Sequence, residues 1–147
     1  PGLEFAARDV AVSDALDAIT MDIAPAYPSG SPVASYRRRA RLYKEEKIHI
    51  TDTFSFRDDM PHQVVLSLIT YEKPKIISEL SERQEISIPS AADGKDPARL
   101  FLSGGRVAAI EEIPITDARL AIAWKHPIYR ILITPLPDSR QFDLEIR

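Results

Sequence analysis

Two neighbouring segments of this chain place one cation and one anion on the same face of a predicted β-hairpin. Residues 34–42 and 48–54 alternate between apolar and polar side chains, which is the period of a β-strand. A turn over residues 44–46 brings the two strands together and places Arg38 directly opposite Asp52. The same register pairs Tyr36 with Phe54, Ala40 with Ile50 and Leu42 with Ile48.

The pairing of Arg38 with Asp52 allows two kinds of chemistry. A guanidinium binds carboxylates and sulfates in a forked geometry, so the arginine could hold an anionic substrate. The neighbours on this face are apolar, however, and an unpaired charge among them would be costly. We therefore expect Arg38 and Asp52 to form a structural ion pair.

The opposite face of the same hairpin is basic. At two-residue spacing it carries Arg37, Arg39, Arg41, Lys47 and His49. Three interpretations remain open: a solvated surface that charge protects from pairing with another chain, an interface with another domain, or a contact with a polyanionic sugar chain.

No set of residues in the sequence forms a recognisable catalytic or metal-binding motif. The chain has no cysteine, and its histidines, His49, His62 and His126, do not follow the spacing of metal ligands. Glycines 104 and 105 lack a phosphate-loop pattern and instead predict a hairpin turn. The sequence therefore predicts no catalytic residue, no metal ligand and no cofactor in this chain.

Four aromatic residues are candidates for sugar stacking. Tyr36 and Trp124 lie among apolar neighbours at strand spacing, so we expect both in the core. Tyr27, between alanine and proline, is the best candidate for an exposed ring, and Tyr129 completes the set.

Short strands separated by proline, glycine and aspartate dominate the chain. Helical turns are expected only over 13–19 and 77–84. The predicted strands are 4–11, 17–24, 33–43, 47–56, 62–70, 84–88, 97–102, 106–113, 118–124, 128–134 and 140–146. This pattern predicts an all-β fold, an antiparallel β-sandwich of about ten strands in a single domain over residues 1–147.

The composition excludes several classes of protein. The 147 residues are 44% hydrophobic and 28% charged, as in an ordinary globular domain. A net charge of −3 argues against a nucleic-acid partner, and no apolar run is long enough for a membrane span. The sequence begins at Pro1 and not at methionine, so we expect a piece of a longer protein.

Several motifs, taken in order, resemble the β-sandwich region of heparinase II/III-like polysaccharide lyases. The first is Asp22-Ile23-Ala24-Pro25-Ala26-Tyr27-Pro28, followed by Tyr36-x-Arg38-x-Ala40-x-Leu42 and Ile48-x-Ile50-x-Asp52. Later parts of the same region resemble Leu68-Ile69-Thr70 with Pro74, Asp117-x-x-Leu120-x-x-x-Trp124, and Tyr129-Arg130-Ile131.

The resemblance implies that this chain is a non-catalytic part of a lyase. Such enzymes pair an N-terminal helical toroid with β-sandwich domains and cleave acidic, uronate-containing polysaccharides by β-elimination. The toroid carries most of that machinery, and no position of this chain matches the family's catalytic or metal-binding residues. The implied partners are the toroid of the parent chain and an acidic polysaccharide such as a glycosaminoglycan. The alternative is a free-standing carbohydrate-binding or interaction module.

Overall fold

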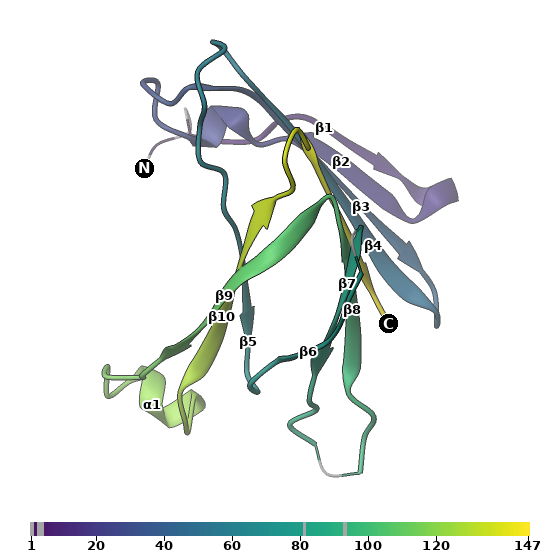
Figure 1. The fold of residues 1–147 in the computed structure, drawn as a ribbon, viewed down its shortest axis with the longest axis vertical. Helices are drawn as coiled ribbons and strands as arrows, with labels where there is room; N and C mark the ends of the chain where they lie inside the picture. Colours follow the sequence, from purple (N-terminus) through teal and green to yellow (C-terminus); the bar gives the residue numbers. More distant parts are fainter. Residues whose placement is uncertain (1, 3–4, 81, 93) are drawn as a thin grey trace.

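The computed structural model describes residues 2, 5–80, 82–92 and 94–147, and β-strands dominate it (Figure 1). Two 3₁₀ turns, Asp14–Leu16 and Ala24–Ala26, and one short helix, α1 (Leu120–Ala123), interrupt the strands. The strands are β1 (Arg8–Ser13), β2 (Ala18–Asp22), β3 (Val33–Tyr43), β4 (Lys47–Phe56), β5 (Leu66–Thr70), β6 (Lys75–Glu79), β7 (Arg83–Ile88), β8 (Ala98–Ser103), β9 (Gly105–Ile113), β10 (Ile128–Pro135) and β11 (Gln141–Ile146).

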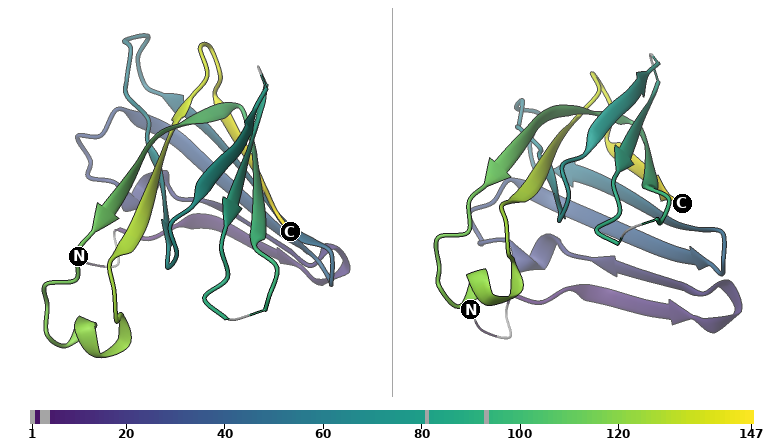
Figure 2. Two further views of the ribbon diagram at one scale, coloured as in Figure 1. Left: turned by 60° about the horizontal axis from the view of Figure 1, so that its bottom comes forward. Right: turned by 90° about the horizontal axis from the view of Figure 1, so that it is seen from below.

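The strands form two antiparallel sheets that face each other, which confirms the predicted sandwich-like all-β fold. The larger sheet has eight strands in the order β1-β2-β3-β4-β11-β8-β7-β6, and the smaller has three in the order β5-β10-β9. Figure 2 shows the smaller sheet over one part of the larger, with β1 and β2 extending beyond it. Both sheets are open, so each keeps two edge strands.

The core lies between the smaller sheet and the middle of the larger one. It is aliphatic except for the rings of Tyr36, Phe54 and Phe142, and the rings of Phe54 and Phe142 are 5.5 Å apart. The apolar residues with at most 1% of their surface exposed are Ile86, Leu100, Leu102, Ile131, Ile133, Phe142 and Leu144. The alternation along β7, β8 and β11 places Ile86, Leu100, Leu102, Phe142 and Leu144 on the inner face of the larger sheet, and Ile131 and Ile133 face them from β10 of the smaller sheet.

Gln84 is a buried polar residue that ties the two sheets together. Its side-chain oxygen accepts a hydrogen bond from the backbone N–H of Val107 at 2.7 Å, so it connects β7 to β9. Its amide nitrogen donates to the carboxylate of Glu79 at 3.1 Å. Both ends of the amide are therefore satisfied, as a buried polar group requires.

The predicted hairpin turn at Gly104 and Gly105 is wrong. β8 belongs to the larger sheet and β9 to the smaller one, so the two glycines carry the chain from one sheet to the other. Gly104 has a φ of +74°, and a Cβ on Gly105 would lie 2.7 Å from the ring of Phe142. A sharp change of sheet over the core explains the two glycines better than a hairpin does.

The predicted strand over residues 118–124 is also wrong, because this segment contains α1. The side chain of Asp117 accepts hydrogen bonds from the backbone N–H groups of Arg119 at 2.7 Å and Leu120 at 3.2 Å. Such an aspartate initiates a helix, and the alternating alanines that follow favour a helix as readily as a strand.

Other predicted elements differ from the structure at their bounds. The strand predicted over 62–70 begins only at Leu66, and β6 occupies part of the segment 77–84, where a helical turn was expected. Residue 81 of that segment and residue 4 of the strand predicted over 4–11 lie outside the described residues. The turn expected over 13–19 is a 3₁₀ turn of three residues.

Candidate functional site

The hairpin formed by β3 and β4 has the predicted register. Tyr36 pairs with Phe54, Arg38 with Asp52, and residues 40 and 42 with residues 50 and 48. The turn over residues 44–46 is closed by a hydrogen bond from the N–H of residue 46 to the carbonyl of residue 43, at 3.0 Å. The register prediction is therefore confirmed from Tyr36 to Leu42, and the pairing is irregular only between Val33 and Ser35.

Arg38 and Asp52 meet in a bidentate ion pair on the inner face of the larger sheet. Nε and Nη2 of the arginine donate to the two carboxylate oxygens at 2.7 and 2.6 Å. The hydroxyl of Tyr36 donates a third hydrogen bond to Asp52 at 3.0 Å. Asp52 is fully buried, whereas one third of the Arg38 side chain is exposed. The carboxylate is thus saturated with protein donors.

The electrostatics of this cluster follow from its burial. The hydrogen bond to Asp52 raises the pKa of Arg38 above its usual value, against the opposing effect of burial. Burial, reinforced by the adjacent carboxylate, raises the pKa of Tyr36. Tyr36 is therefore a neutral donor at any ordinary pH. A closed pair with a neutral tyrosine suits a structural role, and that role remains a prediction.

Asp22 joins the segment 22–28 to this hairpin, a contact that the sequence analysis missed. Its carboxylate accepts hydrogen bonds from the N–H groups of Ala24 at 2.9 Å and Tyr36 at 3.0 Å. Burial opposes ionisation, but these bonds outweigh it and lower the pKa of Asp22. The sequence signal that could have revealed this contact is an aspartate two residues before a 3₁₀ turn, a place where aspartate side chains often accept backbone hydrogen bonds.

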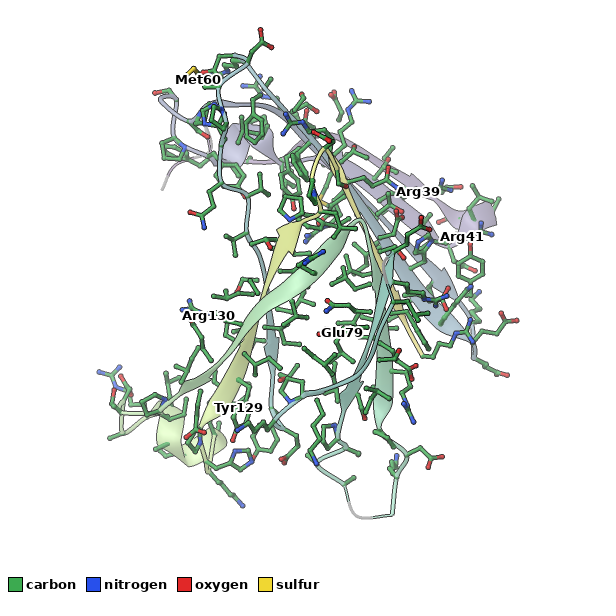
Figure 3. The ribbon with its side chains drawn as sticks, viewed as in Figure 1. Arg39, Arg41, Met60, Glu79, Tyr129 and Arg130 are labelled. Carbon is green, nitrogen blue, oxygen red and sulfur yellow. The ribbon has the colours of Figure 1, made fainter. Side chains whose placement is uncertain are left out.

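The basic residues of the hairpin share the outer face of the larger sheet, as their spacing predicted. In Figure 3, Arg39 and Arg41 lie on the side of β3 away from the smaller sheet, which carries Tyr129 and Arg130. Lys47 binds Glu145 at 2.9 Å, and His49 lies 3.4 Å from Asp143. These acids come from β11, far away in the sequence, so they could not be assigned as partners from the sequence.

The three arginines of β3 differ in their surroundings. The guanidinium of Arg41 lies 4.4 Å from the ring centre of Tyr43, and its buried Nε has no hydrogen-bond partner among the described residues. Arg37 and Arg39 are exposed and form no ion pair with any residue that the structure describes. Arg37 nevertheless lies directly opposite Asp22 in the register of β2 and β3, and the two charges attract each other.

The inner face of the larger sheet is only partly covered. Beyond the smaller sheet, apolar side chains of β1, β3 and β4 face solvent. Their exposed fractions are 55% for Val10, 70% for Val12, 46% for Leu42 and 41% for Ile48. A shallow hollow of about 500 Å³ is lined by Val12, Leu42 and Ile48 among others. We call these four residues the uncovered apolar face.

The three histidines lie in separate surroundings. His49 is on the outer face, His62 binds Asp58 at 2.6 Å, and His126 lies 3.5 Å from Glu72. Within the described part of the chain, no group of three or more histidine, aspartate or glutamate side chains is arranged to hold a metal ion.

None of the helices there is long and apolar enough to cross a membrane.

The aromatic residues follow the predictions only in part. Tyr36 is buried in the core, as expected, and Tyr27 is 44% exposed. Trp124, expected in the core, is half-buried after α1 instead, with its ring 5.8 Å from that of Tyr71. The helix that replaces the predicted strand carries Trp124 away from the core.

Comparison with known proteins adds no identification. A scan against protein-family models and a search of curated proteins both found no match to this chain.

Proposed function

We propose that this chain is the non-catalytic β-sandwich portion of a heparinase II/III-like polysaccharide lyase. In this role it packs beside a helical toroid, supports the strand that carries the metal of the parent enzyme and forms one wall of the substrate cleft. The parent enzyme cleaves acidic, uronate-containing polysaccharide by β-elimination, and this chain alone is inactive.

The uncovered apolar face carries the proposal. Isolated exposed apolar residues are ordinary, but a contiguous row on one face of a sheet marks a surface that another element covers. Val12, Leu42 and Ile48 lie on the same side of the larger sheet as the core, directly beyond the edge of the smaller sheet. A helical domain with an apolar surface fits such a face.

The motifs that carry the resemblance support the proposal from a second direction. Tyr36, Arg38 and Asp52 form one hydrogen-bonded cluster, and Asp22 ties the segment 22–28 to the same strand. The residues of these motifs therefore build one local structure, which is the β3–β4 hairpin with the segment 22–28 attached to it. A related protein would need the same residues to build the same hairpin, whatever substrate it cleaves.

The first test concerns the reading frame around the codon for Pro1. We expect it to encode a helical region of several hundred residues upstream, and the protein it encodes to release unsaturated uronate from an acidic polysaccharide in an absorbance assay. A start codon or signal peptide immediately before Pro1 would overturn the proposal and leave a free-standing module.

The second test concerns the apolar face. Sedimentation of the chain by itself should show self-association, and Leu42→Ser with Ile48→Ser should suppress it. The control is Ile69→Ser with Ile77→Ser, since both of these isoleucines are 52% exposed but lie outside the uncovered apolar face. A chain that is monomeric at every concentration, or equal effects of the two double variants, would contradict the assignment of this face.

A further inference from the structure

The smaller sheet ends at an edge strand, β5, that lacks the protection found on the other edges. An edge strand presents unpaired backbone N–H and C=O groups, and proteins commonly guard it with a β-bulge or with charged side chains. In β1, β6 and β9 the register with the neighbouring strand shifts at one point, and the extra residue lies on the edge strand itself. β5 instead pairs with β10 in one unbroken register from Leu66 to Thr70. Of the four edge strands that the structure describes, it alone has no bulge.

Charged side chains show the same contrast between the edges. The other three edge strands carry Arg8 and Asp9 on β1, Lys75 and Glu79 on β6, and Arg106, Glu111 and Glu112 on β9. From Gln63 to Tyr71 the sequence has no lysine, arginine, aspartate or glutamate. Neither of the usual devices therefore prevents another strand from pairing with β5.

Both the backbone and the inner face of β5 are left open at this edge. In an antiparallel strand, the N–H and C=O groups of alternate residues point away from the neighbour. Among the described residues, β5 forms no backbone hydrogen bonds except those with β10. Leu68, in the middle of the strand, packs against the core but is only partly buried. A further strand would supply hydrogen-bond partners and apolar cover together.

The position of β5 determines what can bind to it. Gln84 connects β9 to β7, so β9 lies on the side of β7, and β5 is the edge that points toward β3, β2 and β1 (Figure 2). The larger sheet continues beyond β5 on that side. There Met21, Ala40 and Ile50, on its inner face, are only partly buried. A strand added to β5 would extend the smaller sheet over this part of the larger one.

A second copy of this chain does not fit the edge of β5. Antiparallel pairing of two β5 strands would place both larger sheets on the same side of the joined smaller sheets. The parts of the larger sheets that extend beyond β5 would then occupy the same space (Figure 2). A single extended segment brings no second layer with it, so it avoids this collision.

We propose that β5 binds one extended segment of a partner protein by strand addition. Main-chain hydrogen bonds supply the affinity in this mode of binding, and alternate side chains supply the specificity. The segment has apolar side chains at every second position, because these face the larger sheet. This inference rests on the backbone of β5 and on the layers beside it, and it does not depend on the proposed function.

The probe is a labelled peptide with the sequence of residues 128–134, which already pairs with β5 within the domain. Its isoleucines 131 and 133 stand at alternate positions, and its arginine keeps it in solution. We expect saturable binding to the whole chain and slower hydrogen exchange at the backbone amides of β5. The same peptide with a fully N-methylated backbone should bind at least about tenfold more weakly, since it keeps the side chains but donates no hydrogen bonds.

Substitutions at two matched isoleucines locate the binding edge. Within the domain Ile69 lies opposite Arg130, so in the same register the arginine of the peptide lies opposite Ile69. Ile69→Glu should strengthen binding about threefold and Ile69→Lys should weaken it about threefold, because charges interact directly across a strand pair. The controls are Ile77→Glu and Ile77→Lys on β6, since Ile77 is also 52% exposed on an edge strand. Both controls should leave binding unchanged.

Several results would overturn the proposal. These are the absence of saturable binding, equal binding of the N-methylated peptide, and equal effects of substitutions at positions 69 and 77. Exchange protection of β5 that rises with the concentration of the chain, without any peptide, would also overturn it. That result would assign the edge to a second copy.

Discussion

Replacing Arg38 by alanine should destabilise the domain by about 3 kcal/mol. Asp52 is fully buried and accepts two of its three side-chain hydrogen bonds from Arg38. Removal of one partner of a buried ion pair costs about 3–5 kcal/mol, because the remaining charge stays buried without compensation. One third of the Arg38 side chain reaches solvent, so water can approach the vacated position, and the lower end of that range applies.

The assay is unfolding by urea and by heat. For a domain of this size, about 3 kcal/mol corresponds to a decrease in Tm of about 6–12 °C. The control is Arg39→Ala, which removes the same side chain from the next position on the exposed outer face and should change stability by less than about 0.5 kcal/mol. Arg38→Ala and Arg39→Ala remove the same side chain from neighbouring positions, so the comparison isolates the effect of the face of the sheet on which the arginine lies.

A double variant separates the burial of the charge from the loss of packing. Arg38→Met with Asp52→Leu replaces the pair by apolar side chains of similar volume, and such replacements are often neutral or stabilising. With Tyr36→Phe added, so that no buried hydroxyl is left without its acceptor, we expect the stability to lie within about 1 kcal/mol of the wild type, well above that of Arg38→Ala alone. A Tm of Arg38→Ala within about 1 °C of the wild type would refute the reasoning.

Three further predictions concern single positions. Gly105→Ala should cost about 2 kcal/mol in urea unfolding, because its Cβ would lie 2.7 Å from the ring of Phe142 in a packed core. Gln84→Leu should cost about 1 kcal/mol in the same assay, because it leaves the partly buried N–H of Val107 in β9 without its acceptor. Glu145→Gln should cost up to about 1 kcal/mol at pH 7. The hydrogen bond from Lys47, opposed by burial, lowers the pKa of Glu145, so thermal unfolding should show this difference vanishing as the pH falls below about 4.

The sequence predicts the hairpin well because its information is local. A strict alternation on two adjacent strands leaves a single register that keeps every apolar side chain on one face. Arg38 and Asp52 then have to meet, and they do. The same reasoning places Arg37 and Arg39 together on the opposite face.

The errors arise where the outcome depends on distant parts of the chain. Two glycines between two strands fit a hairpin, but the pairing of β8 with β11 and of β9 with β10 places the strands in different sheets. Likewise, the partners of Lys47 and His49 lie on β11 because that strand inserts between β4 and β8. No local pattern encodes such an insertion.

The alternation along β3 allows one strand to serve two surfaces. Its even-numbered residues, from Tyr36 to Leu42, run from the core through the buried ion pair to the uncovered apolar face. Arg37 and Arg39 lie on the opposite, outer face. Arg38 and Asp52 lie between the core and the uncovered apolar face. The buried charge of Asp52 is tolerated there only because Arg38 lies directly opposite it. An element that covered the uncovered apolar face would leave Arg37 and Arg39 on the outer face accessible. Substitutions at even-numbered and odd-numbered positions of β3 therefore change opposite faces of the same sheet.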